Sequence, residues 1–222
     1  MNCGRHITML SPGLKCGEIN RKVEFSIYQT FPYLEALALQ RKINSEMING
    51  SGRESIIICE HEPVYTCGIH QDGNTTNLEG VHFIERGGGI TYHGPGQITA
   101  YFMINLNQRG INILDLINFV HEVEIQYLEQ HGIVAHSRLK KETGVWVGNH
   151  KISSTGFALK GGFTLHGIGL NVNTDLQKFS LINPCGFDWS VMTSVSKLNG
   201  KTYHMEEEKG LFLKILKENL GI

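Results

Sequence analysis

A glycine-rich block between positions 86 and 97 carries the residues best suited to chemistry. It reads R-G-G-G-I-T-Y-H-G-P-G-Q, so five glycines in twelve residues surround an arginine, a tyrosine and a histidine. Glycine lets another molecule lie against bare backbone, at a cost of roughly 0.5 to 1 kcal/mol per residue in an ordered element. A block that concentrates this cost and adds polar side chains is typical of a binding wall, although an irregular hairpin turn has similar composition.

The common phosphate-binding motifs do not fit this block. The pattern G-x-x-x-x-G-K-[ST] is absent, and G-x-G-x-x-G fails because Tyr92 stands where the last glycine is due. Residues 81–84 and 98–106 both read as strands. We therefore expect the glycines to lie between two strands and not before a helix.

A cysteine between proline and glycine is the second candidate. Cys185 follows Pro184, whose ring fixes its own φ, and precedes Gly186, which leaves the next residue free. Such a cysteine is presented at a turn and is not a core residue. From these letters alone it is either a nucleophile or a turn residue, and both interpretations stay open.

The other four cysteines are weaker candidates. Cys59 lies in an isoleucine run and reads as a small core residue, while Cys3 and Cys16 are near an end expected to be mobile. Two cysteines and two histidines within twelve residues resemble a zinc set, but a Cys-x-His pair in a strand is the wrong spacing (Cys59, His61, Cys67 and His70). We expect no metal site, and the odd, scattered cysteines predict free thiols in a reducing compartment.

Two histidines stand out from the rest. A lone histidine is more often a satisfied structural side chain than a catalyst. His93 and His166 are each followed by glycine, which leaves room beside the imidazole, and each is next to a predicted strand. We expect both to line a site.

Composition narrows the class of protein. The chain has 222 residues, with 20 basic and 21 acidic side chains and a formal charge of −1, which disfavours nucleic acid as a partner. No stretch approaches the roughly 18 apolar residues that span a bilayer, so we expect no membrane partner. Residues 1–22 are read as an N-terminal extension, either a mobile tail or a weak targeting segment, before one domain over residues 23–222.

The apolar pattern predicts three helices and several strands. Helical spacing covers residues 33–48, a segment after the candidate N-cap Asn112 that ends before Gly132, and residues 205–219. Strands are expected at residues 56–59, 64–66, 163–173, and at 144–147 and 152–159, which flank a turn from which Lys151 enters the second strand. Residues 71–80 and 135–143 read as loops. The mixture predicts an α/β or α+β single domain with a mixed sheet flanked by helices.

The motifs taken together resemble the lipoyl(octanoyl) transferase family, whose hallmark is R-G-G-x-x-T-Y-H-G-P-G-Q. Further family motifs follow in order over about residues 25–215: H-x-P-V-Y-T-x-G from position 61, E-T-G-V-W-V from 142, K-I at 151, H-G-x-x-L-N-V-N-x-D-L from 166, N-P-C-G from 183 and T-S at 193. The resemblance implies the catalytic-domain fold shared by biotin and lipoate protein ligases.

The resemblance also assigns residues. It implies that Cys185 and Lys151 are the catalytic pair and that His166 supports the site. The implied acyl-binding residues fall in three segments: Arg86, Gly87, Gly88, Gly89, Ile90, Thr91, Tyr92 and His93; Ser154, Thr155 and Gly156; Gly167, Ile168 and Gly169. Four positions depart from the family pattern, and two of them lie in these segments and bear on acyl-chain preference (Glu62, Cys67, Gly89 and Gly169).

The implied reaction moves an octanoyl (or lipoyl) group from acyl carrier protein, through a thioester on Cys185, to a lysine of a lipoyl domain. The expected acceptors are the lipoyl domains of 2-oxoacid dehydrogenase E2 subunits and the glycine cleavage H protein. No cofactor is expected because the acyl group arrives activated, and the expected location is the cytoplasm, or the mitochondrial matrix in a eukaryote. Three alternatives stay open: an ATP-dependent lipoate or biotin ligase, a lipoyl amidotransferase, and a catalytically silent acyl- or carrier-binding protein.

Overall fold

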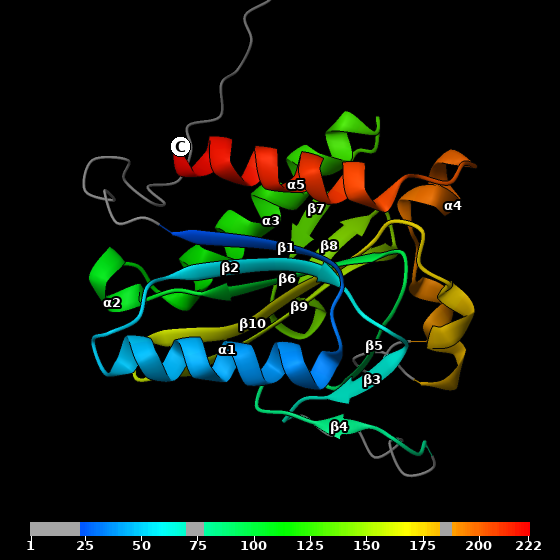
Figure 1. Cartoon of the computed structure of the whole chain (residues 1–222). Helices are drawn as coiled ribbons and strands as arrows, with labels where there is room; N and C mark the ends of the chain where they lie inside the picture. Colours follow the sequence, from blue (N-terminus) through cyan, green and yellow to red (C-terminus); the bar gives the residue numbers. More distant parts are fainter. Residues whose placement is uncertain (1–22, 70–77, 183–187) are drawn as a thin grey trace, which may run out of the picture.

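Short apolar runs rich in isoleucine and valine form the strands of a central seven-stranded sheet (Figure 1). The computed structural model describes residues 23–69, 78–182 and 188–222. Within them the strand order is β1-β2-β6-β10-β9-β8-β7, with bounds β1 Glu24–Thr30, β2 Ser55–Glu60, β6 Gln97–Met103, β7 His136–Arg138, β8 Gly144–Val147, β9 His150–Lys160 and β10 Phe163–Asn171. Among the described strands of this seven-stranded sheet, β1 and β2 pair in parallel and the other neighbours pair antiparallel. The predicted mixed sheet is therefore confirmed.

A smaller sheet is built around the glycine-rich block. Its strands lie in the order β4-β3-β5, with bounds β3 Val64–Cys67, β4 His82–Phe83 and β5 Ile90–His93. The strand β5 pairs antiparallel with β3, and β4 pairs parallel with it. Figure 1 places this sheet beside the first turn of the helix α1.

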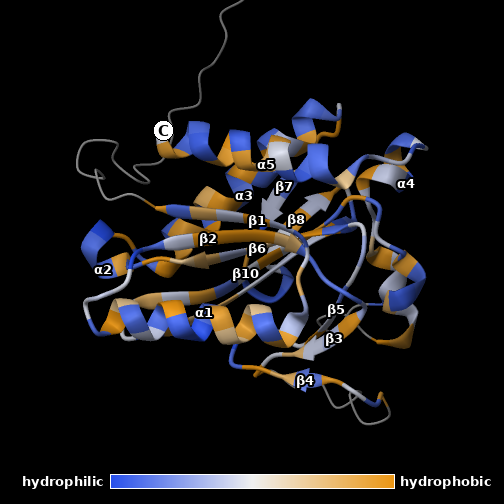
Figure 2. Cartoon of the chain, in the orientation of Figure 1, coloured by the Kyte–Doolittle hydropathy of each residue, from blue (hydrophilic) through white to orange (hydrophobic). Residues whose placement is uncertain are grey.

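Helices cover both faces of the central sheet (Figure 1). The helix α1 (Tyr33–Ile48) packs on one face, and α3 (Ile113–Gln130) and α5 (Met205–Leu220) pack on the other. Short helices α2 (Leu106–Arg109) and α4 (Val195–Asn199) complete the helical part. The long helices show alternating polar and apolar stripes in Figure 2, as helices that cover a sheet should.

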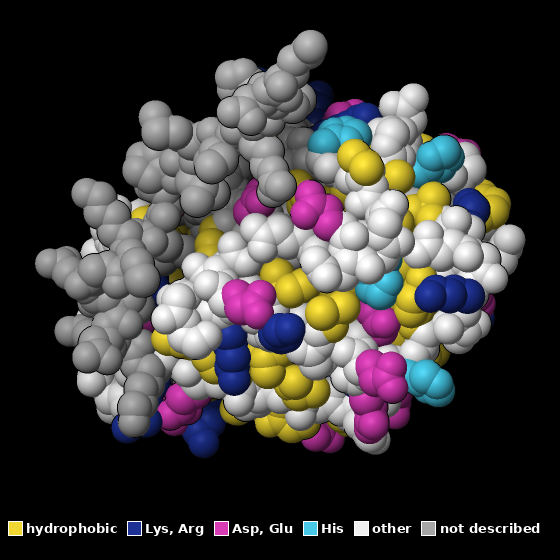
Figure 3. Space-filling model, turned by 90° about the horizontal axis from the view of Figure 1, so that it is seen from above, with side chains coloured by type: hydrophobic (Ala, Val, Ile, Leu, Met, Phe, Trp, Pro, Cys, Tyr) yellow, Lys and Arg dark blue, Asp and Glu magenta, His cyan; other side chains and the backbone are white. Residues whose placement is uncertain are grey.

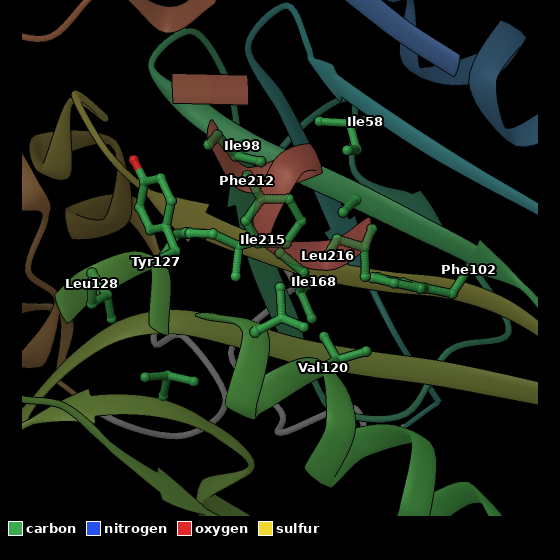
Figure 4. Close-up of a cluster of buried hydrophobic side chains, with 14 of the residues drawn as sticks. Ile58, Ile98, Phe102, Val120, Tyr127, Leu128, Ile168, Phe212, Ile215 and Leu216 are labelled. Carbon is green, nitrogen blue, oxygen red and sulfur yellow. The ribbon is translucent and has the colours of Figure 1, made fainter. Parts of the chain in front are cut away.

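The larger core lies between the sheet and the pair α3 and α5. Figure 4 shows Phe212 and Leu216 of α5 and Val120 of α3 converging on Ile98 and Ile168 of the sheet. The second core lies beneath α1, where buried side chains such as Ala36 and Met47 meet the opposite sides of β2 and β6. Each strand of the sheet centre is therefore buried on both faces.

A buried ion pair links α5 to the turn that follows the glycine-rich block. The Lys209 ammonium lies 3.0 Å from Glu60 Oε1 and also donates to the carbonyls of Tyr28 and Gln29. The other carboxylate oxygen, Glu60 Oε2, accepts from the Gly96 amide at 2.8 Å. The ion pair therefore joins three distant parts of the chain.

Most predicted elements are present, and five expectations change. The predicted strand over 81–84 is limited to β4, a strand forms inside the glycine-rich block as β5, and the strand over 98–106 ends at Met103 before α2 begins. The loop over 135–143 contains the edge strand β7 and a 3-10 turn, Lys140–Glu142. The strand β1, whose side chains are mostly polar and partly exposed at a sheet edge, has no counterpart in the prediction.

The surface carries interspersed charges of both signs. Seen from above, on the side of α5, acidic and basic side chains alternate and hydrophobic ones occur in small groups (Figure 3). None of the helices in the described ranges is long and apolar enough to cross a membrane.

The N-terminus of α3 offers a stability test. Asn112 Oδ1 accepts from the Leu114 and Asp115 amides, and the Asp115 carboxylate accepts from the Asn112 amide, which makes a complete capping box. Asn112→Ala should lower the free energy of unfolding by about 1 kcal/mol, while Asn112→Ser should retain most of it. Urea denaturation measures both, and equal stability of the alanine and serine variants would contradict the assignment of the cap.

Candidate active site

A cavity lies between the central sheet, the small sheet and the first turn of α1. It is a narrow space that is partly open to solvent. Its walls come from six elements and loops, and the lining residues are Tyr33, Ile84, Arg86, Thr91, His93, Thr99, Tyr101, Ser154, Thr155, Gly156, His166, Gly167, Ile168 and Gly169. Three segments separated by up to 80 residues along the chain thus meet at one place.

Glycines remove part of the side-chain layer from the floor of the cavity. In the sheet register Gly167 pairs with Gly156 and with Tyr101, and two positions along Gly169 pairs with Ser154 and Thr99. A Cβ placed on Gly156 or Gly169 would meet the lining residues Arg86 or His93, whereas a Cβ on Gly167 would meet Ala100 and Phe102 of β6. Glycine at 156 and 169 therefore leaves a trough along the sheet, and glycine at 167 allows the close approach of β6.

The gap above this floor is narrow. A Cβ placed on Gly156 would lie 3.0 Å from the carbonyl oxygen of Gly87 and 3.1 Å from Arg86 Cδ. The Gly87 amide also donates to the Phe157 carbonyl at 2.9 Å, which ties the glycine-rich block directly to β9. The glycine-rich block, which forms the roof of the cavity, therefore meets the floor at this end. Glycine is needed at position 156 to keep the slot open.

The Arg86 side chain holds the roof in place. Its Nη2 donates to the Thr66 carbonyl at 2.8 Å and to Thr66 Oγ1 at 2.9 Å, and its Nη1 donates to the Gly87 carbonyl at 2.9 Å. The residue is only 7% exposed. The guanidinium therefore locks β3 and the glycine-rich block together beside Gly156.

The strand alternation of β5 divides the block into two sides. Thr91 and His93 face the cavity, whereas Ile90 and Tyr92 pack into a separate hydrophobic cluster with Cys67 and Phe179. The three glycines before them also lie outside the lining, although Gly89 accepts from the Gly68 amide and so carries the roof (Gly87, Gly88 and Gly89). The block builds the wall mostly through its backbone.

The imidazoles of the cavity are neutral. Burial lowers the pKa of His93 to about 3, and its Nδ1 lies 2.7 Å from Gln97 Oε1. Burial likewise lowers the pKa of His166 to about 4 and that of His61, whose Nε2 lies 2.6 Å from the Tyr101 hydroxyl. Apart from the Arg86 guanidinium, which donates to Thr66 and Gly87, the polar side chains of the lining are hydroxyls and neutral imidazoles, so they suit an uncharged ligand.

His166 is the most constrained of these residues. Its φ of 64° is in the left-handed region, which is uncommon for a residue other than glycine. Its amide donates to Gln40 Oε1 at 3.1 Å, and its Nε2 lies 3.8 Å from Glu85 Oε2, too far for a hydrogen bond. Strained, buried polar residues of this kind cluster at functional sites.

Lys151 lies beside the other end of the floor. Val145 pairs with Ser153, but the next residue along β8, Trp146, pairs with Lys151, so Ile152 is an extra residue that forms a bulge. A bulge re-aims the side chains next to it, and here it places Lys151 on the same face as Trp146 and the cavity floor. Its Nζ lies 5.7 Å from the Trp146 ring centre.

The surroundings of Lys151 connect it to the cavity and to the segment around position 192. A Cβ on Gly144 would lie 2.7 Å from Lys151 Cε, and Gly144 pairs with the cavity residue Ser154. The Lys151 carbonyl accepts from the Thr193 amide at 2.9 Å. Lys151 is 2% exposed and lies next to the lining without forming part of it.

The sequence candidates fall into four groups. Ten of the predicted residues line one cavity, Lys151 adjoins it, Cys185 lies outside the described residues, and five residues of the glycine-rich block lie outside the lining (Gly87, Gly88, Gly89, Ile90 and Tyr92). Cys59 and Cys67 are buried in two different hydrophobic clusters. Sequence reasoning missed four lining residues, Tyr33, Ile84, Thr99 and Tyr101; the alternation of Thr99 and Tyr101 within a predicted strand was the available signal.

Comparison with known proteins identifies the family. Residues 32–217 match the model of the lipoyl protein ligase A/B catalytic domain. The chain belongs to this family. A "Probable octanoyltransferase 2" of Picrophilus torridus is 38% identical over 200 residues, covering 90% of this chain and 80% of the relative. An "Octanoyltransferase" of Syntrophotalea carbinolica is 39% identical, covering 80% of this chain and 85% of the relative.

Solved structures of lipoate and biotin protein ligases share the fold. Lipoate-protein ligase A with bound ATP superposes with a TM-score of 0.68 at 16% identity, covering 90% of this chain and 87% of that one. The biotin protein ligase of Aquifex aeolicus gives a TM-score of 0.52 at 15% identity, covering 89% of this chain and 68% of that one. The fold expected from the family resemblance is therefore confirmed.

The neutral histidines make stability depend on pH. Because the pKa of His93 is lowered by folding, the unfolded chain takes up its proton first as the pH falls below about 6.5, and stability is lost until the folded pKa is reached. The free energy of unfolding should fall by up to about 1.4 kcal/mol per pH unit for each such histidine. His93→Gln should reduce this slope in denaturation curves between about pH 7 and pH 4.5; an unchanged slope would contradict a neutral buried His93.

Proposed function

We propose that this acyltransferase binds an octanoyl chain along the glycine floor and transfers it to a lysine of a lipoyl domain. The family match and the octanoyltransferase relatives support the reaction class. The observation that carries the proposal is the juxtaposition of a narrow slot, lined by apolar, hydroxyl and imidazole groups beside Arg86, with a buried lysine at one end. A fatty acyl chain needs such a slot, and acyl transfer needs a basic group beside its carbonyl.

The chain direction follows from the position of Lys151. Because Lys151 adjoins Ser154 through Gly144, we place the acyl carbonyl at that end and run the hydrocarbon toward Gly156 and Gly167. Each methylene removed from water contributes about 0.8 kcal/mol. The tight contact between Gly156, Arg86 and Gly87 then limits the length of chain that fits.

Chemistry is proposed to proceed in two transfers. The Cys185 thiolate attacks the thioester carbonyl of the carrier, the bond to the carrier sulfur breaks, and the carrier leaves as a thiol by taking a proton from the Lys151 ammonium while an acyl-cysteine forms. The acceptor amine then attacks this thioester, the carbon–sulfur bond to Cys185 breaks, and an amide forms. The Lys151 ammonium stabilises the thiolate, whose pKa is otherwise about 8.5 for free cysteine, and the Lys151 amine later accepts the proton of the incoming amine.

The donor we propose is octanoyl-acyl carrier protein, and the acceptors are lipoyl domains of 2-oxoacid dehydrogenase E2 subunits and the glycine cleavage H protein. A thioester donor is already activated, so the two transfers need no ATP or organic cofactor. The thiols of Cys59 and Cys67 suit a reducing compartment, so we place the enzyme in the cytoplasm, or in the matrix of a mitochondrion. Residues 23–222 form the catalytic domain in this proposal.

The nucleophile is tested by intact mass spectrometry. After incubation with octanoyl carrier protein and no acceptor, the protein should gain one octanoyl group, located on Cys185 by peptide mapping. Cys185→Ala should lose the adduct and all transfer, and Lys151→Met should lower the transfer rate by at least about a hundredfold, the range typical of general acid–base groups. Lys160→Met, at the exposed end of the same strand, is the matched control.

Two outcomes would reject the proposed mechanism. Full transfer by Cys185→Ala would exclude the acyl-cysteine. Incorporation that depends on ATP and free acid, and that survives the same substitution, would identify a ligase on this fold instead; faster transfer from an octanoylated lipoyl domain than from the carrier would identify an amidotransferase.

The slot length is tested at Gly156. A methyl group there would sit 3.0 Å from the Gly87 carbonyl oxygen, so Gly156→Ala should shorten the slot. Octanoyl transfer should fall about tenfold, which corresponds to one or two buried methylenes, while butanoyl transfer falls less. Gly210→Ala, in α5 with open space around the added carbon, is the control; equal losses for both acyl lengths would contradict the proposed chain direction.

A further inference from the structure

A pair of ionisable side chains lies beneath the strand that carries Lys151. His121 and Glu124 are one turn apart on α3, and they are 1% and 0% exposed. Around them the core is aliphatic, with Val120 and Val123 as neighbours on the same helix. Burying such groups is costly unless they are satisfied, so their presence in this core needs a reason.

Both side chains form hydrogen bonds to residues of β9 on the face that is covered by α3. His121 Nε2 lies 2.8 Å from Thr155 Oγ1, and its Nδ1 lies 2.6 Å from Ser137 Oγ on β7. Glu124 Oε1 accepts from the Ser153 hydroxyl. The other oxygen, Glu124 Oε2, is buried without a hydrogen-bond partner in the structure as described. His121 is therefore fully satisfied, and Glu124 is satisfied only on the side of β9.

Ser153 is the first residue after the bulge. The register Val145 with Ser153 and Trp146 with Lys151 leaves Ile152 unpaired between them. Ser153 thus points toward α3, whereas Lys151 points toward the cavity face. The hydrogen bond from Ser153 to Glu124 therefore fixes β9 next to the bulge that sets the direction of the Lys151 side chain.

We propose that Glu124 is a positioning residue for Lys151: through Ser153 it fixes the bulge that turns Lys151 toward the cavity, and through its charge it tunes the protonation of the Lys151 amine. The proposal rests on the role of Lys151 in the proposed function. It explains why a carboxyl group with one unsatisfied oxygen is kept in an aliphatic core. A purely structural tie to Ser153 needs no ionisable group.

The charge states of the neighbours define how the pair is coupled. Burial raises the pKa of Glu124 to about 8, against the opposing effects of the Ser153 hydrogen bond and the Lys151 ammonium. His121 is neutral in this range because burial lowers its pKa to about 4, with Lys151 contributing in the same direction. Tyr127, the next turn of α3, is engaged with Glu208. Lys151 and Glu124 therefore interact electrostatically across β9.

The sign of the coupling follows from reciprocity. The Lys151 ammonium favours ionised Glu124, so ionised Glu124 must equally favour the ammonium form of Lys151. Near neutral pH Glu124 is mostly protonated, which leaves the Lys151 amine easier to deprotonate for the second transfer. As the pH rises through about 8, the new carboxylate keeps Lys151 protonated longer. Removing this carboxylate should therefore move the titration of Lys151 to lower pH.

The experiment compares Glu124→Gln, which keeps the acceptor for Ser153 but cannot ionise, with Ser153→Ala, which keeps the charge but removes the tie. In Glu124→Gln the alkaline limb of the kcat/KM profile should move down by about half to one pH unit, with KM unchanged at neutral pH. In Ser153→Ala kcat at neutral pH should fall about tenfold, because a displaced catalytic group loses alignment, and the limb should also move down because loss of the Ser153 hydrogen bond raises the pKa of Glu124. Glu129→Gln, exposed on the same helix, is the matched control.

A second readout is independent of catalysis. In protein labelled with carbon-13 lysine, the Lys151 side-chain signal is assigned by its loss in Lys151→Arg, and its titration is followed with and without Glu124→Gln. A shift to lower pH supports the coupling even if octanoyl transfer itself is not observed, which separates this proposal from the proposed function. An unmoved Lys151 titration, together with a wild-type pH profile in Glu124→Gln and wild-type kcat in Ser153→Ala, would overturn it.

Discussion

The close approach of a glycine-rich segment to a sheet floor that lacks part of its side-chain layer is the constraint on which the site depends. Glycines at 156 and 169 leave the trough open, and the Gly87 amide closes one end of it by bonding to β9. Arg86 then fixes the height of the roof by spanning to Thr66. Shape here comes from backbone positions, so the slot is rigid, and its dimensions change whenever a Cβ is added.

Electrostatics in the site follow from the same burial that gives it shape. Desolvation keeps His93 and His166 neutral and keeps Glu124 protonated near neutral pH. Glu124 and Lys151 interact through a medium from which burial has removed water, so the charge of one affects the other.

Sequence reasoning found the helices and the binding wall because these are local signals. The segments that became α1, α3 and α5 have strong apolar periods, and Asn112 and Gly132 mark the ends of α3 where expected. The edge strand β7 was missed because its three residues are all polar, whereas in β1 the alternation of Phe25 and Ile27 with polar residues was a signal that the prediction did not use. The family motifs supplied the remaining candidates, including Lys151.

The parts of the site that sequence could not give are those set by register. Tyr101 reaches the cavity because β6 pairs with β10 at Gly167, and Lys151 faces it because one extra residue enters β9. Neither fact is visible in local composition. The buried pair His121 and Glu124 looks like part of an ordinary amphipathic helix until the strand beneath it is known.

The ion pair between Glu60 and Lys209 has a consequence for engineering the chain. Glu60 also holds the Gly96 amide, so the last long helix is electrostatically attached to the rim turn between β5 and β6. Truncation into α5 would remove Lys209, leave the Glu60 carboxylate without its ion-pair partner, and loosen that turn. Fusion partners and affinity tags should therefore be appended after Gly221, and α5 itself left whole.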